Sequence, residues 1–367
     1  MNGNDGHRNE RIVVVSFNTR GGLHHYITQL SNALGQKAEV DLILPRGSEL
    51  EHISSKVNVR EMDIGNTKKN FIKNTVEFWK IIELILFIRD RRPSVVHFNG
   101  CYPWMNFILP FIDDIPTVMT IHDIVPHPGS SRTDVQSVRD MLLSYADRVI
   151  VHGEYARDNI RNVDKGIVRI VPHGNYSFFS CGQTCVEGTE RTFLFFGRIS
   201  EYKGIGYLVK AINELNAEGH DLKLIIAGEG DLSPYKEDME DRPWFEVINR
   251  YVADDEVPEI FGRCMAVVLP YIEVTQSGVV QIALGLGKPV ISTTVGCLPE
   301  IIKEGVNGLL VPSADVTALK KAIVHMAENC SEAQEMGQRG QVMADSEYSW
   351  DRIADMTLGV YDEIKRR

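Results

Sequence analysis

The chain has 367 residues, more than one hydrophobic core usually organises, so two domains are expected. With 43% hydrophobic and 24% charged residues, its composition is that of an ordinary globular protein, which excludes the disordered and collagen-like classes. The formal net charge is -11, and residues 186–367 carry 18 Lys and Arg against 30 Asp and Glu, which argues against nucleic acid as a partner because cations bind phosphate backbones.

The first half of the chain alternates apolar runs with helical patterns. Residues 1–10 are polar and lack the apolar segment of a signal peptide, so a cytoplasmic protein is expected. A strand is predicted at 12–16, followed by the Gly21-Gly22 turn and a helix over 26–34. Further strands are predicted at 40–44, 95–98, 117–121 and 148–151, with helical stretches at 71–92 and 134–146. Continuous apolar strands spaced by helices predict a parallel sheet covered on both faces.

The same pattern restarts after a segment rich in Gly, Ser and Cys at 174–190. Strands are predicted at 192–196, 222–227, 245–248, 266–269, 289–292 and 308–311. The fold class is therefore α/β, with two Rossmann-like, doubly wound domains joined by a linker near residue 185. Ligands of such sheets bind outside the carboxyl ends of the strands.

Two cations follow the first predicted strand of the second domain. Arg198 and Lys203 would leave the strand end together, where a diphosphate could pair with both. The alternative is a solvated turn that carries two surface cations.

A second candidate element lies at 270–278, between the strand at 266–269 and a helical stretch at 279–286. Ser277 and Gly278 stand where that helix begins, so backbone N–H groups and the helix dipole could hold phosphate oxygens. The alternative is an ordinary N-cap by Ser277.

Six short motifs occur in order along the second half of the chain: Phe196-Gly197-Arg198 with Lys203-Gly204, Ala227-Gly228-Glu229-Gly230, Leu269-Pro270 with Glu273, Gly287-Lys288-Pro289-Val290, Val295-Gly296 with Pro299-Glu300, and Gly305-Val306-Asn307-Gly308-Leu309. Together they resemble the nucleotide-sugar domain of the retaining glycosyltransferases of family four, which have the GT-B fold. The resemblance implies an N-terminal acceptor-side domain at 1–183, a donor domain at 184–347 and a cleft between them. It also implies that a helix at 348–367 crosses back onto the first domain.

One family feature is altered in this sequence. The family commonly has two glutamates eight positions apart, the first near the transferred sugar and the second on the ribose. Here Glu273 is followed by Gln281, whereas counting back from Gly287 places the pair on Val274 and Ile282. Glu273 is preferred, because a carboxylate beside a phosphate site is otherwise hard to explain, and Gln281 could still hydrogen-bond to ribose hydroxyls.

Several first-domain residues match the family by position. Gly21 and Gly22 resemble its glycine loop, His122 the histidine that contacts the donor sugar, and His173 a signature near the hinge. Each could instead be an ordinary turn, packing or capping residue. The acceptor-side candidates, on weaker grounds, are Arg20, His24, His25 and His97.

The helical stretch 71–92 combines apolar residues with basic ones. Lys68, Lys69, Lys73, Lys80, Arg89, Arg91 and Arg92 would suit a face that lies on a membrane, and a buried amphipathic helix with a solvated edge is the alternative. Peripheral contact with the cytoplasmic face of a membrane is one expectation.

The resemblance implies transfer of a hexose-type sugar from a UDP- or GDP-sugar to a glycan, glycolipid or other cell-surface acceptor, with retention and without a metal or cofactor. Arg198, Lys203, Glu273 and His122 are the candidate catalytic residues, with Gly197, Gly228, Ser277, Gly278 and Gln281 on the donor. The alternatives are a GT-B nucleotide-sugar epimerase and a non-catalytic nucleotide-sugar-binding subunit. A dehydrogenase is disfavoured, because the first strand lacks the spaced three-glycine fingerprint.

Overall fold

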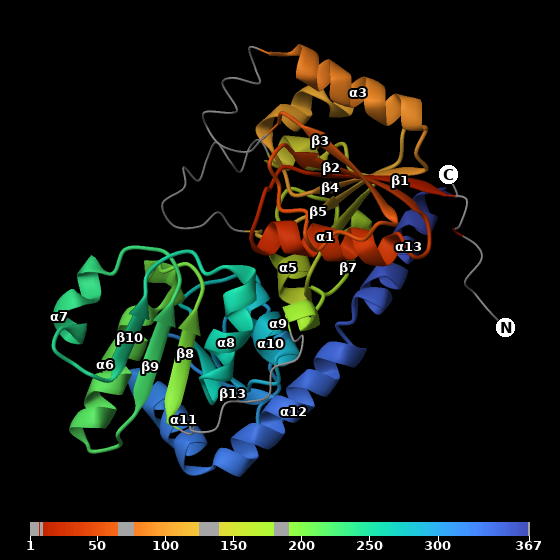
Figure 1. Ribbon diagram of the computed structural model, residues 1–367. Coiled ribbons are helices and arrows are strands. Elements are labelled where there is room, and N and C mark those ends of the chain that lie inside the picture. Colours follow the sequence, from red (N-terminus) through yellow and green to blue (C-terminus); the bar gives the residue numbers. More distant parts are fainter. Residues whose placement is uncertain (1–6, 8–9, 65–76, 125–138, 180–190, 366–367) are drawn as a thin grey trace. The chain divides into compact units, whose positions relative to one another are not determined.

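The computed structural model describes residues 7, 10–64, 77–124, 139–179 and 191–365 (Figure 1). The chain forms two compact units, Met1–Gly174 with Trp350–Arg367, and Asn175–Ser349. The predicted domain boundary at 183–184 lies outside the described residues.

The described part of the first unit contains a parallel seven-stranded sheet, in the order β3-β2-β1-β4-β5-β6-β7. Its strands are β1 (Arg11–Ser16), β2 (Glu39–Pro45), β3 (Val57–Met62), β4 (Val95–Asn99), β5 (Thr117–Thr120), β6 (Arg148–Val151) and β7 (Val168–Ile170). Sequence analysis predicted β1, β2, β4, β5 and β6 and missed β3 and β7. The two missed strands form the edges of the sheet, where half-exposed positions such as Arg60 and Arg169 interrupt the apolar run.

Helices cover both faces of this sheet. Helices α1 (Gly22–Leu34) and α13 (Trp350–Lys365) contact each other on one face, and α3 (Trp79–Arg91) lies on the other (Figure 1). The core under α1 and α13 includes Ile12, Val14, Leu30 and Leu358. The short helix α5 (Glu154–Asn159) follows β6. Of the predicted helix 71–92, the structure forms α3, and residues 71–76 lie outside the described residues. Residues 134–138 of the helix predicted at 134–146 also lie outside them.

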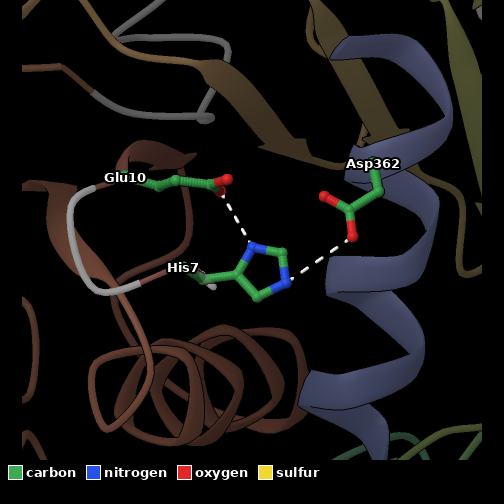
Figure 2. A group of neighbouring side chains, drawn as sticks. All are labelled: His7, Glu10 and Asp362. Carbon is green, nitrogen blue, oxygen red and sulfur yellow. Dashed lines mark ion pairs between the residues drawn. The ribbon is translucent and has the colours of Figure 1, made fainter. Parts of the chain in front are cut away.

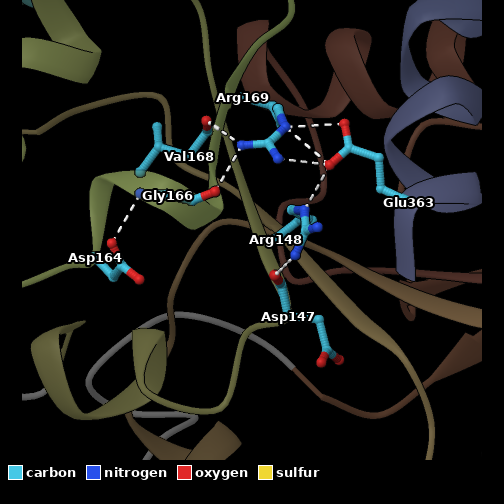
Figure 3. A network of polar contacts seen from close by, with 7 residues as sticks. All are labelled: Asp147, Arg148, Asp164, Gly166, Val168, Arg169 and Glu363. Carbon is cyan, nitrogen blue, oxygen red and sulfur yellow. Dashed lines mark hydrogen bonds and ion pairs between the residues drawn. The ribbon is translucent and has the colours of Figure 1, made fainter. Parts of the chain in front are cut away.

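Helix α13 is tied to the edge of the sheet by an ion-pair network (Figure 3). The Glu363 carboxylate accepts hydrogen bonds from Arg148 Nε at 2.8 Å and from Arg169 Nη2 at 2.6 Å. Hydrogen bonding by Arg169 is the main cause that lowers the pKa of Glu363 to about 2. The prediction that the C-terminal helix packs back on the first domain is confirmed.

The described part of the second unit contains a parallel six-stranded sheet, in the order β10-β9-β8-β11-β12-β13. Its strands are β8 (Thr192–Phe196), β9 (Lys223–Ala227), β10 (Phe245–Ile248), β11 (Ala266–Leu269), β12 (Val290–Thr293) and β13 (Gly308–Val311). All six were predicted within one residue. They are readable from sequence because they are mostly apolar and buried.

Helices again cover both faces. On one face lie α6 (Ile205–Ala217) and α11 (Val316–Glu328), and on the other lie α8 (Val257–Gly262), α9 (Gly278–Gly285) and α10 (Leu298–Ile301). The remaining helices are α7 (Lys236–Met239) and α12 (Cys330–Ser346). No helix within the described ranges is long and apolar enough to span a bilayer.

Each sheet has a point at which its strand order reverses. In the first sheet this switch lies between β1 and β4, and in the second it lies between β8 and β11. Helices that follow strands on either side of a switch go to opposite faces, which leaves a crevice at the carboxyl ends of those strands. Gly21 and Gly22 follow β1, while Arg198 and the segment 270–278 follow β8 and β11.

Candidate functional site

The loop after β8 is shaped by two glycines with positive φ. Gly197 has φ +104, and a Cβ added there would lie 2.9 Å from Lys203 Nζ. The absent side chain therefore leaves room for the Lys203 ammonium to lie over the loop. Arg198 is exposed directly after Gly197. Both predicted cations thus belong to the same turn at the switch point.

This turn is joined to the loop after β11 through backbone contacts. Gly204 has φ +69, and a Cβ there would lie 1.9 Å from Pro270 O, so only glycine fits. The Ile272 N–H donates to Tyr202 O at 2.8 Å. The two sequence elements predicted to hold phosphate are therefore parts of one structure.

Tyr271 connects the lysine to the start of α9. Lys203 Nζ lies 5.2 Å from the centroid of the Tyr271 ring, a cation–π distance. The Tyr271 hydroxyl lies 3.2 Å from Ser277 Oγ. Burial is the first cause that raises the pKa of Tyr271 to about 12, so its hydroxyl stays protonated. Sequence analysis did not single out Tyr271, although it stands between the two predicted elements.

Ser277 occupies the N-cap position of α9 but does not cap the helix with its side chain. Its backbone is extended, with φ -140 and ψ 116, and no side-chain cap hydrogen bond forms. The first turn of α9 contains no acidic residue. The ordinary N-cap alternative is therefore wrong, and the positive end of the helix dipole lies beside the Lys203 turn.

A further glycine brings the loop after β9 against the same turn. Gly228 has φ +146, and a Cβ added there would lie 2.1 Å from Gly197 O. The Ile199 N–H also donates to Glu229 O at 2.9 Å. The shape of the Lys203 turn thus depends on a glycine in the loop that follows the neighbouring strand β9.

The two positions of the altered glutamate pair differ in exposure. Glu273 is exposed, whereas Gln281 is fully buried and neither its Oε1 nor its Nε2 has a hydrogen-bond partner among the described residues. Val274 and Ile282, the alternative positions, contribute to the apolar core on this face. An unpaired buried amide is costly, so a partner for Gln281 would stabilise the unit.

Two other motif residues hold the fold together. Lys288 is 6% exposed and its ammonium donates to Cys264 O at 2.7 Å. Asn307 is fully buried, and its Oδ1 accepts from the Lys303 N–H at 2.8 Å. These contacts give Lys288 and Asn307 a structural role within the second unit.

In the first unit, His122 is part of a buried histidine pair. Its Nε2 lies 2.7 Å from Asn99 Oδ1, and its Nδ1 lies 2.9 Å from His152 Nε2. His152 follows β6 as His122 follows β5, and the two strands are neighbours. Sequence analysis missed His152, although its place after a strand was the same signal that pointed to His122.

A third ring, His173, completes this cluster around Tyr26 of α1. The Tyr26 ring centroid lies 4.7 Å from that of His122, 5.1 Å from His152 and 5.0 Å from His173. Burial lowers the pKa of all three histidines, His122, His152 and His173, below the usual value of the side chain. His173 Nδ1 donates to Gly174 O at 2.8 Å.

The other first-unit candidates occupy different positions. Gly21, with φ +76, precedes α1, Gly22 begins that helix, and Arg20 is exposed beside them. His24 and His25 are both buried in the first turns of α1. His24 Nε2 lies 2.7 Å from Glu49 O.

His97 is held on both sides inside the core. Its Nδ1 lies 2.6 Å from the Tyr361 hydroxyl and its Nε2 lies 2.7 Å from Thr120 Oγ1. Burial lowers its pKa to about 3. In this conformation His97 links β4 to α13, which is a structural role.

One group of residues has the chemistry of metal ligands. His7 Nδ1 lies 3.1 Å from Glu10 Oε2, and His7 Nε2 lies 3.5 Å from Asp362 Oδ2 (Figure 2). The Lys365 ammonium contacts both carboxylates. Because Lys365 already supplies positive charge, the cluster is an ion-pair network that links the N-terminal segment to α13.

Family models match most of the chain. Residues 20–174 match the model described as Glycosyltransferase Family 4, and residues 190–329 match the one described as Glycosyl transferases group 1. An uncharacterized glycosyltransferase of Methanocaldococcus jannaschii is 31% identical over 179 residues, which are 48% of this chain and 46% of that protein. The matched stretch thus spans about half of that relative.

Solved structures share the fold over nearly the whole chain. Sucrose-phosphate synthase from Thermosynechococcus elongatus has a TM-score of 0.79 at 20% identity, covering 97% of this chain and 99% of the other. Anabaena HepE in complex with UDP-glucose has a TM-score of 0.73 at 14% identity, covering 97% and 100%. At these identities the likeness concerns the GT-B fold.

Proposed function

The chain belongs to the family-four glycosyltransferases, and from that premise we propose that it transfers a hexose-type sugar from a nucleotide-diphosphate donor with retention of configuration. The acceptor we propose is a glycan, a glycolipid or another cell-surface molecule. Sequence analysis expected this activity, and the family assignment supports its general class, a glycosyltransferase.

The observation that carries the proposal is the connection of Lys203, through Tyr271, to Ser277 at the start of α9. A leaving nucleotide diphosphate gains negative charge as its bond to the sugar breaks. Preorganised cations and N–H donors stabilise that charge more strongly than water does, because they need not reorient during the reaction. We assign the diphosphate to Lys203, Arg198 and the N–H groups at Ser277 and Gly278.

The proposed donor is a UDP- or GDP-sugar, with no cofactor and no metal. HepE, whose fold this chain shares, is described in complex with UDP-glucose. Two cations on one turn would perform the charge neutralisation that a metal ion performs elsewhere. Gly197 and Gly228 let the turn approach the diphosphate closely.

The remaining assignments concern the sugar and the ribose. We assign Glu273, which is exposed, to the transferred sugar and Gln281 to the ribose, because a bound hydroxyl would pair the buried amide of Gln281. Gly21, Gly22, His122 and His173 retain their proposed places on the donor side. Arg20, His24 and His25 retain theirs on the acceptor side, whereas His97, held in the core by Tyr361 and Thr120, is assigned a structural role.

We also propose peripheral contact with the cytoplasmic face of a membrane through the outer face of α3. Large apolar side chains remain exposed there: Phe78, Trp79, Ile82 and Leu86. Lys80, Arg89 and Arg91 pair with acidic side chains, so apolar insertion would contribute more than attraction to anionic lipid. Flotation with vesicles of neutral lipid tests this, and Trp79→Ser with Leu86→Ser should weaken it.

A thermal-shift panel of UDP-, GDP- and ADP-sugars tests the donor assignment. A ligand that binds only the folded state must raise Tm, so one nucleotide should stabilise the protein more than the others. Transfer is then followed as nucleotide release that depends on added acceptor. Release without acceptor but with a changed sugar would indicate an epimerase. Binding without turnover on any acceptor extract would indicate a non-catalytic subunit.

A further inference from the structure

Two carbonyl oxygens stand at the ends of a buried chain of side chains in the first unit. At one end the Asn99 amide donates from Nδ2 to Leu23 O at 3.0 Å, and Asn99 Oδ1 faces His122 Nε2 at 2.7 Å. His122 Nδ1 faces His152 Nε2 at 2.9 Å. At the other end His152 Nδ1 faces Val171 O at 2.9 Å. All four contacts have hydrogen-bonding distances.

Counting hydrogens shows that two neutral rings cannot make all of these bonds. Val171 O and Asn99 Oδ1 are acceptors, so each needs a hydrogen from the ring that faces it. The contact between the two rings needs a third hydrogen. Two neutral imidazoles carry one N–H each, which is one hydrogen too few.

Exchanging the positions of Oδ1 and Nδ2 in the Asn99 amide does not supply the missing hydrogen and only moves the unmade bond to another contact. If Asn99 Nδ2 donated to His122 Nε2, Asn99 Oδ1 would face Leu23 O, and two acceptors would stand 3.0 Å apart. A single extra proton, by contrast, supplies the third hydrogen and completes every contact. Hydrogen-bond satisfaction therefore favours one positive charge shared by the pair.

We propose that His122 and His152 form a single-proton site in which the two rings share one proton taken from solvent. His152 is then a positioning residue, since it holds His122 through Nδ1 while the other nitrogen of His122 is aimed at Asn99. The proposal concerns a proton site that the assigned glycosyl transfer does not itself require.

Burial and neighbouring rings act against the charge. Burial is the first cause that lowers the pKa of His122, followed by the rings of His152, His173 and His97. For His152 the causes are burial and then His173, while the bond to Val171 acts in the opposite direction. Tyr26 packs on the pair as a neutral ring. The completed hydrogen bonds are what oppose these effects.

The proton would act on the start of α1. Asn99 holds Leu23 in the first turn of that helix, next to Gly21 and Gly22. When the pair is protonated, Asn99 can keep its amide on Leu23 O and its oxygen on His122. When the proton leaves, one contact of the chain lacks a hydrogen, and the proposal places that loss at Asn99, so the first turn of α1 loses support. The glycine loop would thereby become sensitive to pH.

Ring ¹⁵N NMR of the full chain from about pH 4 to about pH 9 tests the site, since histidine normally titrates within that range. We expect the resonances of His122 and His152 to move together with one midpoint above about pH 5 and a total uptake of one proton. The protection of the His25 amide against exchange, measured relative to the intrinsic rate at each pH, should fall above that midpoint, because its N–H donates to Gly21 O at 2.9 Å in the first turn of α1. Separate midpoints, or two rings that stay neutral throughout, would overturn the proposal.

A substitution of His152 gives a second test, because charge repulsion between the rings and a shared proton predict opposite shifts in the pKa of His122. If the rings merely repel each other's charge, His152→Phe raises the pKa of His122. If they share a proton, His152→Phe lowers it. His173→Phe is the matched control, because His173 adjoins the same rings but lies outside the chain of contacts, and it should not lower the pKa of His122. A raised pKa in His152→Phe contradicts the shared proton, and the wild-type titration decides if that variant does not fold.

Discussion

The ammonium group of Lys203 lies over the buried ring of Tyr271, 5.2 Å from its centroid. Lys203 and Tyr271 come from loops that follow different strands, β8 and β11, which are neighbours in the sheet. The ring fixes the direction of the lysine side chain, and its hydroxyl fixes Ser277. The cation is thus preorganised before any ligand arrives, which is the condition under which electrostatic catalysis is most effective.

Replacing that cation should reduce catalysis and leave the fold intact. Lys203→Met keeps the length and the packing of the side chain and removes its charge, so we expect kcat/KM to fall about 100-fold. Arg198→Ala should lower turnover in the same way. Initial rates of nucleotide release, with circular dichroism as a check on folding, measure the effect. Lys210→Met, on the exposed side of α6, is the matched control, and rates equal to it would refute the phosphate assignment.

A methyl group on Gly228 should disrupt the turn that carries Lys203. In Gly228→Ala the new Cβ would lie 2.1 Å from Gly197 O, so backbone must move, and we expect a loss of about 3 kcal/mol or more. Gly219→Ala is the control, because Gly219 also has a positive φ, +93, but its Cβ would meet no atom within 4 Å. Its cost should be about 1 kcal/mol, from backbone strain alone. Urea unfolding measures both, and equal losses would contradict the steric argument.

Replacing Gln281 should raise the stability of the unliganded protein and weaken its binding of the donor. Gln281→Leu removes a buried amide that has no partner within the described part of the chain, so the unliganded protein should gain about 1 kcal/mol. If the amide binds ribose, the same change should weaken nucleotide-sugar binding about tenfold, which is about 1.4 kcal/mol. Denaturant unfolding and calorimetric titration measure the two effects. Unchanged affinity would remove Gln281 from the donor site, and lower stability would mean that its amide is already paired.

The Glu363 network should make stability depend on acid. Its pKa is lowered from 4.5 to about 2, chiefly by Arg169, so its ionic bonds contribute fully above pH 4.5 and are lost as pH falls toward 2. Because the Glu363 side chain is 36% exposed, water screens part of this effect, and Glu363→Gln should cost only about 1 kcal/mol at neutral pH, with the difference from wild type vanishing on acidification. Glu240→Gln, in a wider exposed pair with Lys236, is the control and should change little. A difference that persists in acid would point to packing instead of charge.

The glutamate register illustrates the limit of reading a motif. Sequence spacing allowed either Glu273 with Gln281 or Val274 with Ile282. The structure places Ile282 in the apolar core, packs the half-buried Val274 against that core and leaves Glu273 exposed. Side-chain direction in a loop depends on what the neighbouring elements cover, and spacing along the chain does not report it.

By itself the sequence determined the α/β class and eleven of the strands, because buried parallel strands are continuous apolar runs. It also determined the turn that carries Arg198 and Lys203, because glycines mark places where backbones approach closely. The tertiary structure alone decided which strand ends are neighbours. That order sets Tyr271 beside Lys203 and His152 beside His122. It also revealed the edge strands β3 and β7, which sequence analysis missed because polar and apolar residues are mixed in them. Partners so far apart in the chain meet only when strands pair, so their contacts leave no local pattern to read.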